Sequence, residues 1–306
     1  MDIYILGLLI GILTFAVVVL NYFGIFQRIT GPVVNDTFKK CESPGCVRCT
    51  LYDKVLANAK THIEEYQQST NKRNDIQREK ESPNEQDIQR IRGSLQKQIP
   101  DGSAQKPEVF YLHGLTIMPW WTSNFNFSTD VKILEDNFGT IFQEFCHVNL
   151  DSNALWKVNN TPNGQWKVLH LVNQGVLQRN MVDLCPTTFD IVSSLPSVMT
   201  KNVFANIAFS VIEPGTVITE HYGPTNIRLR CHLGLVTPKS CSLCVAGSYS
   251  QWKKGECLLF DDSYLHSVVN EGEDTDQWRA VLIVDLWHPH VTLAERTILN
   301  NIFKPD

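Results

Sequence analysis

Four segments in the C-terminal part of this chain share a strand-like composition: NVFANIAFSVIEPG (202–215), IRLRCHLGLVT (227–237), ECLLFDD (256–262) and AVLIVDLWH (280–288). Each is rich in β-branched or aromatic residues with partial alternation, and turn residues lie between them, as in short strands. The pattern predicts one all-β sandwich or barrel with a helical front over residues 107–306.

The composition of the whole chain sets outer limits. With 306 residues, the chain has room for one large domain or two ordinary ones. Its net charge of −5 and its pI of about 6.0 show no basic excess. We therefore expect no nucleic-acid partner.

The N-terminal segment IYILGLLIGILTFAVVVLNYF (3–23) contains no charged side chain. As a helix that rises about 1.5 Å per residue, it would cross the roughly 30 Å hydrocarbon core of a bilayer. A cleaved signal peptide is the competing interpretation, but the segment lacks a basic start and a clear A-x-A cleavage site. We therefore expect one transmembrane anchor within residues 1–25, and the lipid bilayer as its partner.

Two sequence rules disagree about which side of the membrane holds the rest of the protein. No Lys or Arg precedes the span, whereas basic residues follow it, which favours a cytoplasmic body. Only Arg28 lies close to the span, however, and three N-x-S/T glycosylation sequons favour the lumen. The sequons are at Asn35, Asn126 and Asn159. We expect a type II anchor, with the body of the protein in the lumen of the endoplasmic reticulum or Golgi.

Residues 26–106 are expected to connect the anchor to the folded domain. They contain a C-x4-C-x2-C motif formed by Cys41, Cys46 and Cys49. A zinc site normally needs four ligands, so a local disulfide, palmitoylation and plain thiols all stay open. The chain has nine cysteines, and an odd number leaves at least one unpaired in a secretory compartment.

Apolar residues recur every three or four positions in residues 51–67, which predicts a helix there. Residues 68–106 are polar and contain no aromatic side chain. Such a segment cannot bury enough apolar surface to offset its ordering entropy, so it predicts a linker. Within it, Ile88, Ile91 and Leu95 could form one short helical face.

Two segments carry both histidine and arginine: EHYGPTNIRLRCHLGL (220–235) and FDDSYLHSVVNEGEDTDQWRAVLIVDLWHP (260–289). Each places a histidine, His221 or His266, at a turn beside a strand, and each continues with arginine on a strand. Iron that reacts with O2 needs neutral imidazole ligands and open coordination positions. The two histidines are therefore candidate iron ligands.

A dicarboxylate cosubstrate such as 2-oxoglutarate needs a cation at the end of its pocket, and a guanidinium grips a carboxylate through two hydrogen bonds. Arg279 lies thirteen residues after His266, which leaves room for a strand, a turn and a second strand. Arg230 and His232 are two residues apart on a strand, so they share a face. These side chains could meet one anionic ligand.

The common iron triad adds a carboxylate two residues after the first histidine, as H-x-D. Here that position is Gly223, which offers no ligand. Three explanations stay open at this point: water fills the coordination position, another carboxylate such as Asp261 or Asp262 reaches the metal, or the protein binds no iron.

The same residues resemble the aspartyl/asparaginyl β-hydroxylase family. HYGPTNIRLRCHLGL (221–235) is similar to that family's first signature, and FDDSYLH (260–266) followed by RAVLIVDLWHP (279–289) is similar to its second. The resemblance extends over roughly residues 107–306. The anchor, CESPGCVRCT and KPEVFYL (106–112) further resemble the membrane-anchored subgroup of aspartate β-hydroxylase domain-containing proteins.

The resemblance implies a double-stranded β-helix, that is, a cupin-like jelly roll with flanking helices. It also implies that glycine replaces the carboxylate ligand, with water in its place, and that His221 and His266 bind Fe(II). Asp262 would hold an iron-bound water from outside the metal's ligand shell. Arg228 is a candidate substrate contact. The implied contacts of 2-oxoglutarate are Trp166, Ser210, Arg230, His232 and Arg279.

The resemblance further implies a dioxygenase that uses Fe(II), 2-oxoglutarate and O2 to hydroxylate the β-carbon of Asp or Asn in secretory-pathway proteins. The family's larger member has a long repeat-containing region before this domain, which this chain lacks, so the substrate protein stays open. One alternative is a catalytically inactive module that binds metal or 2-oxoglutarate on the same fold. Another is a lectin-like or cupin-type interaction protein whose arginines hold some other anion.

Overall fold

The computed structural model describes residues 52–72, 83–122, 125–148, 155–159, 161–273 and 277–305, all within one compact unit. The expected anchor, the three juxtamembrane cysteines and the sequon at Asn35 lie outside these residues. In the part of the chain that the structure describes, every helix is too short or too polar to span a bilayer.

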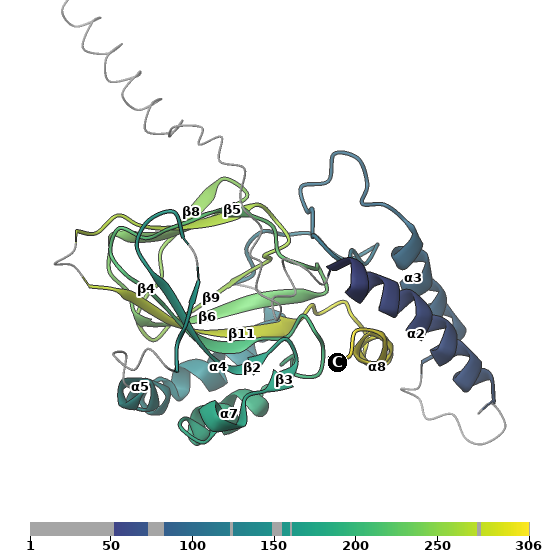
Figure 1. Ribbon diagram of the computed structural model, residues 1–306, viewed down its shortest axis with the longest axis horizontal. Coiled ribbons are helices and arrows are strands. Elements are labelled where there is room, and N and C mark those ends of the chain that lie inside the picture. The colour runs from purple at the N-terminus through teal and green to yellow at the C-terminus, as the bar shows by residue number, and fades with distance from the viewer. Residues whose placement is uncertain are drawn as a thin grey trace, which may run out of the picture. The chain divides into compact units, whose positions relative to one another are not determined.

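Two antiparallel β-sheets form the core (Figure 1). The larger sheet has the strand order β1-β2-β4-β11-β6-β9, with β3 paired to β2, and the smaller sheet has the order β5-β10-β7-β8. The larger sheet consists of β1 (Lys157–Asn159), β2 (Trp166–Asn173), β3 (Val176–Leu177), β4 (Ile207–Ile212), β6 (Arg228–Val236), β9 (Cys257–Phe260) and β11 (Arg279–Trp287). The smaller sheet consists of β5 (Val217–His221), β7 (Cys241–Val245), β8 (Ser248–Ser250) and β10 (His266–Asn270).

From β4 to β11 the chain passes back and forth between the two sheets. β4, β6, β9 and β11 pair within the larger sheet, while β5, β7, β8 and β10 pair within the smaller one. Every pairing among these strands is antiparallel. This is the connectivity of a jelly roll. The core is therefore a cupin-like jelly roll with flanking helices, as the sequence predicted.

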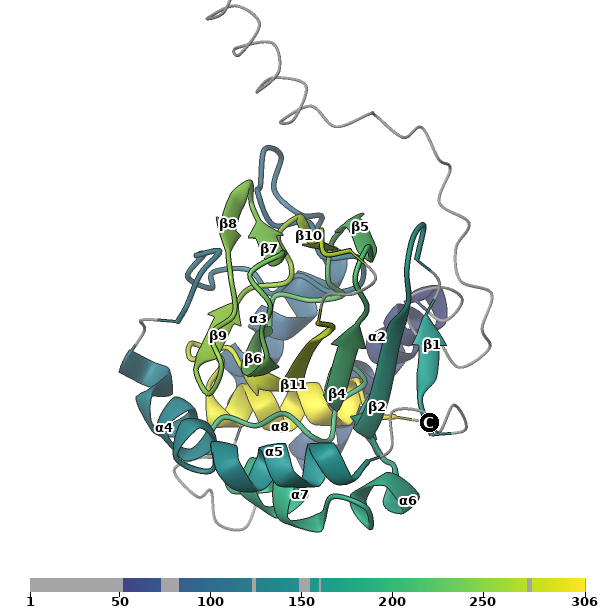
Figure 2. The ribbon, with the colours of Figure 1, turned by 90° about the vertical axis from the view of Figure 1, so that its left-hand side faces the viewer.

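The central strand β11 explains why RAVLIVDLW is almost continuously apolar. It lies between β4 and β6, and every one of its residues is buried (Figure 2). One face of β11 packs on helices through residues such as Leu282, and the other faces the smaller sheet through residues such as Ile283. A strand covered on both faces needs apolar residues at successive positions, not alternating ones.

Helices cover the face of the larger sheet that points away from the smaller sheet (Figure 1). The buried side of α5 brings Ile141 and Phe145 onto this face, where the centroids of the Phe145 and Phe209 rings are 5.2 Å apart. These elements are the helical front expected from the sequence. They are η1 (Phe125–Phe127), α4 (Ser128–Asp136), α5 (Phe138–His147), α6 (Arg179–Val182) and α7 (Pro186–Ser193).

Three further helices form a second apolar cluster beside the sheets: α2 (Tyr52–Lys72), α3 (Glu85–Gln96) and α8 (Leu293–Ile302). α2 confirms the helix predicted over 51–67. α3 begins with a capping box, in which Asn84 accepts from the Asp87 amide and the Asp87 side chain accepts from the Asn84 amide.

The structure corrects the interpretation of residues 68–106 as a linker. Ile88, Ile91 and Leu95 do form a helical face, but that face is buried against the apolar cluster of α2 and α8. The chain that follows α3 is also tied to the core, because the Lys106 amide donates to the Ser263 carbonyl at 3.0 Å. The described residues before 107 are thus continuous with the jelly roll.

Candidate functional site

The two histidines of the expected iron site meet across a pair of strands in the smaller sheet. β5 ends at His221 and β10 begins at His266, and the antiparallel register places these residues directly opposite each other. Their ring centroids are 4.0 Å apart, with the planes inclined by 53°. Residues 45 positions apart in the sequence thus form one histidine pair.

Local hydrogen bonds fix the tautomer of both rings. His221 Nδ1 lies 2.7 Å from the Thr219 carbonyl, and His266 Nδ1 lies 2.9 Å from the Tyr264 carbonyl. Because a carbonyl oxygen only accepts, each Nδ1 carries the proton, and in a neutral ring Nε2 carries the lone pair. This is the arrangement that a histidine needs to bind a metal through Nε2.

Gly223 cannot be replaced by a carboxylate ligand without a rearrangement. A Cβ atom at this position would lie 2.5 Å from the Asp262 carboxyl carbon and 2.6 Å from both of its oxygens. Asp262 therefore occupies the space into which a side chain at position 223 would extend. Among the described residues, no three His, Cys, Asp or Glu side chains form a cluster that could hold a metal. A metal here would have two protein ligands, which fits the first of the three explanations for glycine.

Asp262 belongs to a buried group of two arginines and two aspartates, which we call the charge-matched cluster: Arg228, Arg230, Asp262 and Asp285. Arg228 contacts both carboxylates, with Nη2 2.5 Å from Asp262 and Nη1 3.0 Å from Asp285. Arg230 donates two hydrogen bonds to the Asp285 carboxylate, at 2.9 and 3.1 Å, and its Nη1 lies 3.5 Å from an Asp262 oxygen. Burial alone would raise the pKa of Asp262, but the charges of Arg228 and Arg230 outweigh it and hold that pKa well below its usual range.

The expected substrate contact at Arg228 is not supported by its position. Its side chain is only 3% exposed, and its guanidinium is occupied by Asp262, Asp285 and the Phe204 carbonyl. The alternation of β6 gives the reason, because it turns Arg228, Arg230 and His232 toward the interior between the sheets. Arg228 thus holds Asp262 in place, while Arg230, at 19% exposure, is the more accessible arginine.

A second buried group, which we call the unmatched cluster, consists of Arg279, His232, Ser210 and Trp252. Arg279 donates to the Ser210 carbonyl and hydroxyl at 3.2 and 3.3 Å, and its guanidinium carbon lies 4.7 Å above the Trp252 ring. No described carboxylate forms an ion pair with it, and its Nε has no hydrogen-bond partner. Burial lowers the pKa of Arg279, and the neighbouring Cys241 thiol only partly offsets this effect, as expected for a buried charge without a carboxylate partner.

His232 adds a second buried donor to the unmatched cluster. The Trp252 indole N–H donates to His232 Nδ1 at 3.2 Å, so the lone pair is on Nδ1 and the proton is on Nε2. His232 Nε2 is buried and has no partner. Burial first, and then the charges of Arg279 and Arg230, lower the pKa of this histidine and keep it neutral.

The unmatched cluster fits a carboxylate. A cation without a counter-charge and an N–H group without an acceptor are both costly when buried, and an anion that bridged them would remove both costs. Trp166 completes the wall of this region by donating its indole N–H to the Ser210 hydroxyl at 3.1 Å. Four of the five residues expected to contact 2-oxoglutarate (Trp166, Ser210, His232 and Arg279) thus share this region. The fifth, Arg230, is engaged in the charge-matched cluster.

The remaining candidate ligand, Asp261, has no cationic partner among the described residues. Its carboxylate accepts from the Gln105 amide and from the Ser263 backbone amide at 2.9 Å. Burial raises the pKa of Asp261 to about 7, since these two donors are neutral and only partly compensate. Neighbouring aspartates in the FDD motif therefore have opposite environments, and Asp262 is the one beside the histidine pair.

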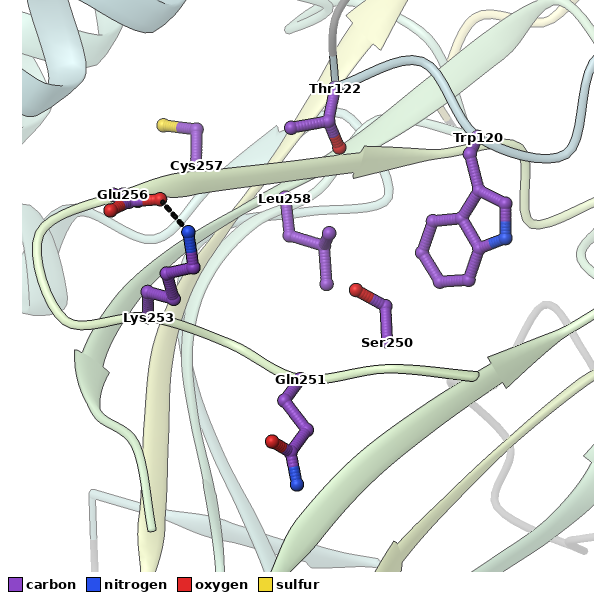
Figure 3. A pocket seen from close by; sticks show the side chains of 8 residues that line it. All are labelled: Trp120, Thr122, Ser250, Gln251, Lys253, Glu256, Cys257 and Leu258. Carbon is purple, nitrogen blue, oxygen red and sulfur yellow. Dashed lines mark hydrogen bonds and ion pairs between the residues drawn. The ribbon is translucent and has the colours of Figure 1, made fainter. Parts of the chain in front are cut away.

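A separate pocket of about 300 Å³ opens beside the loop between β8 and β9 (Figure 3). None of the residues expected to form the site lines it. The pocket shares its loop with Trp252, which lies between the lining residues Gln251 and Lys253 in the sequence. Its lining consists of Trp120, Thr122, Ser250, Gln251, Lys253, Glu256, Cys257 and Leu258.

The sequence analysis missed two residues that organise the site, Asp285 and Trp252. Asp285 is the only acidic residue in the apolar strand RAVLIVDLW, and a lone carboxylate in a fully buried strand is a signal that it has a cationic partner. Trp252 lies in a loop without any pattern, and its two contacts, with His232 and Arg279, come from different strands. No signal in the sequence identifies it.

The strand order, the histidine pair and the buried arginine define a cupin-like jelly-roll protein with a candidate metal site. The family model of the aspartyl/asparaginyl beta-hydroxylases matches residues 135–289. Human aspartate beta-hydroxylase domain-containing protein 2 is 44% identical over 278 residues, which cover 87% of this chain and 70% of that protein. The chain therefore belongs to the aspartyl/asparaginyl β-hydroxylase family.

Two further similarities are more distant. Human aspartyl/asparaginyl beta-hydroxylase is 35% identical over 202 residues, which cover 64% of this chain and 26% of that protein. The crystal structure of a prolyl-4-hydroxylase from Pseudomonas putida has 9% identity and a TM-score of 0.33, and the match covers 52% of this chain and 98% of that one. At this TM-score the fold assignment rests on the strand order, not on the neighbour.

Proposed function

We propose that this chain is an Fe(II)- and 2-oxoglutarate-dependent dioxygenase that hydroxylates the β-carbon of Asp or Asn side chains in a protein substrate. The observation that carries the proposal is the unmatched cluster, in which the buried Arg279 Nε and His232 Nε2 have no described acceptor, next to a histidine pair with lone pairs on Nε2. Membership in the aspartyl/asparaginyl β-hydroxylase family supports the same reaction.

The roles of the residues follow from these positions. His221 and His266 would hold the iron through Nε2, and Asp262, fixed by Arg228 and Arg230, would orient a water where a third ligand is missing. Arg279 and Ser210 would bind one carboxylate of 2-oxoglutarate, while the His232 Nε2–H would donate to the cosubstrate. Trp166 would orient Ser210 through its indole N–H, and the exposed part of Arg230 would contact the cosubstrate from the charge-matched side.

Bound iron would supply the redox chemistry, in which O2 and 2-oxoglutarate become succinate and CO2 while one oxygen atom enters the substrate C–H bond. The protein contributes a dry, shaped site, because every residue of the two clusters except Arg230 is buried. Exclusion of water protects such oxidative chemistry from side reactions.

A metal-binding measurement tests the proposal first. Full-length protein reconstituted with Fe(II) without oxygen should bind one iron, and the double change His221→Ala with His266→Ala should abolish binding. Thermal unfolding with metal should then show stabilisation by 2-oxoglutarate. Persistent metal binding in the double variant would refute the ligand assignment.

Mass spectrometry tests the reaction itself. Cells with and without this chain should differ in a +16 Da mass on Asp or Asn residues of at least one protein, and purified chain should release succinate with a peptide that spans that residue. If metal and 2-oxoglutarate bind but no residue changes mass and no succinate forms, the chain is the inactive binding module on the same fold.

We also propose that the chain is a type II membrane protein with the jelly roll in the secretory lumen. The apolar segment 3–23 and the three sequons support this arrangement, and Asn126 is exposed in the structure. Endoglycosidase treatment of the full-length chain should therefore increase its mobility. Absence of glycan, together with digestion of the C-terminal part by protease in intact microsomes, would place the body in the cytoplasm.

A further inference from the structure

The strand β2 contributes a histidine to the interior between the sheets that the proposed reaction does not yet use. Trp166 packs into the apolar cluster between the sheets, whereas Leu169 and Leu171 pack into the cluster on the helix side. Because alternate residues of a strand share a face, His170 lies on the same face as Trp166 and points toward the smaller sheet. It is only partly exposed.

His170 lies near the charge-matched cluster and not near Arg279. The charges that act on it are those of Lys157, Arg230 and Asp285. The pairing of β2 with β4, and of β4 with β11, places His170 level with Ile283, which is two residues along β11 from Asp285 and four from Arg279. Four residues of a strand span roughly 13 Å. Along the strand, His170 is therefore closer to the charge-matched cluster than to the arginine proposed to hold the far carboxylate of 2-oxoglutarate.

His170 differs from the other histidines of the jelly roll in its hydrogen bonding. The rings of His221, His232 and His266 each bond to a backbone carbonyl or a tryptophan. No described residue hydrogen-bonds to the His170 ring. Burial, followed by the charges of Lys157 and Arg230, lowers its pKa to about 4, so the ring is neutral at physiological pH and offers one donor and one acceptor.

The ring nitrogens of His170 are not among the fully buried polar atoms that lack a partner, so they are accessible to solvent or to a ligand. A donor and an acceptor that no described residue engages are available for hydrogen bonds to a ligand. The arginine proposed to hold the far carboxylate of the cosubstrate lies four residues along β11 from the level of His170, so the ligand that we assign to His170 is the other reactant of the proposed reaction, the polypeptide.

We propose that His170 is a substrate-binding residue whose neutral imidazole hydrogen-bonds the polypeptide that carries the target Asp or Asn. The inference rests on the proposed function and adds one residue to it. A neutral ring suits this role because it can donate to a carboxylate or carbonyl oxygen and accept from an amide, so it serves both aspartyl and asparaginyl targets.

The test uses full-length protein and the peptide spanning the residue that gains 16 Da in the cell comparison above. His170→Leu should raise the KM for that peptide about tenfold, the loss expected for one hydrogen bond to a partner that is left unpaired. The kcat and the stabilisation by 2-oxoglutarate with metal should stay unchanged. His170→Gln, which keeps a donor and an acceptor, should recover most of the affinity.

A matched control is His147→Leu, because His147 is exposed on α5, on the helix side of the larger sheet. It should leave the KM unchanged. An unchanged KM in His170→Leu would overturn the inference and leave the proposed function intact, and loss of metal or 2-oxoglutarate binding would show a structural role instead. If the wild-type protein modifies no residue in cells, the proposed function itself fails and this inference falls with it.

Discussion

The interior between the two sheets contains buried arginines in two opposite electrostatic settings. In the charge-matched cluster, two carboxylates balance the charges of Arg228 and Arg230. In the unmatched cluster, Arg279 faces a hydroxyl, a carbonyl and an indole ring, and no described carboxylate pairs with it. The charges of the first cluster are thus balanced within the protein, whereas the charge of Arg279 would be balanced only by a bound anion.

The largest expected effect comes from removing a charge from the complete cluster. Asp285→Asn keeps the shape of the side chain but leaves Arg228 and Arg230 with one carboxylate between them. Breaking a buried ion pair costs about 3–5 kcal/mol, so the free energy of unfolding should fall by that amount in urea denaturation. A loss below about 1 kcal/mol would mean that the cluster contributes little to folding.

The corresponding change in the unmatched cluster should act on ligand binding instead. Arg279→Met removes an uncompensated buried charge, so the free energy of unfolding without ligand should change by less than about 1 kcal/mol, because the lost contacts and the relieved charge oppose each other. Wild-type protein with metal and 2-oxoglutarate at 100 times its Kd should gain about 2.7 kcal/mol, and the variant should gain none. Equal stabilisation of both proteins would contradict the assignment of Arg279.

The sequence predicted much of this contrast, and its limits have physical reasons. The sequence placed Arg230 and His232 on one face of β6, because alternate residues of a strand point to the same side. This prediction depends only on neighbouring residues, so the structure confirms it. The pairing of His221 with His266 needed a register between strands that are not adjacent in the sequence. No local pattern sets that register, and only the family resemblance joined the two histidines.

The same reason explains the misinterpretation of α3. Its three apolar residues are too few to predict a stable helix in an otherwise polar segment, because most of a helix's stability comes from tertiary packing. The residues that bury them come from α2 and from α8, and α8 lies about 200 residues further along the chain. The ion pair of Arg228 with Asp285 was not predicted either, because Asp285 lies on a different strand.

Gly223 tests how rigidly the charge-matched cluster holds Asp262. Gly223→Ala would place a Cβ 2.5 Å from the Asp262 carboxyl carbon, which two arginines prevent from moving. We expect a loss of about 1–3 kcal/mol in the free energy of unfolding, as for other overpacked sites. Gly93→Ala is the control, because a Cβ there meets nothing within 4 Å inside α3, and it should stabilise the protein by about 0.5–1 kcal/mol. Equal effects of the two changes would show that Asp262 yields easily.

The smallest expected effect concerns Asp261, whose environment contrasts with that of Asp262 because it faces only neutral donors. Burial raises the folded-state pKa of Asp261 to about 7, from about 3.8 when unfolded. The protonated carboxyl therefore stabilises the fold below pH 3.8, and this contribution is lost as the pH rises through 7. The Asp261→Asn side chain is uncharged at every pH. The Gln105 side-chain oxygen has no partner in the wild-type fold, and it can accept from the amide of the new asparagine once the Gln105 side chain rotates.

Urea denaturation of Asp261→Asn and wild-type protein should thus give similar free energies of unfolding near pH 4. By pH 8 the variant should be more stable by about 1 kcal/mol, a conservative figure for a carboxyl whose pKa is raised by burial. The matched change Asp262→Asn should act in the opposite direction, because the lowered pKa of Asp262 contributes stability at neutral pH that is lost only in strong acid. If Asp261→Asn instead destabilises the protein at pH 8, Asp261 is charged in the fold and has a cationic partner, and the contrast between the two aspartates is wrong.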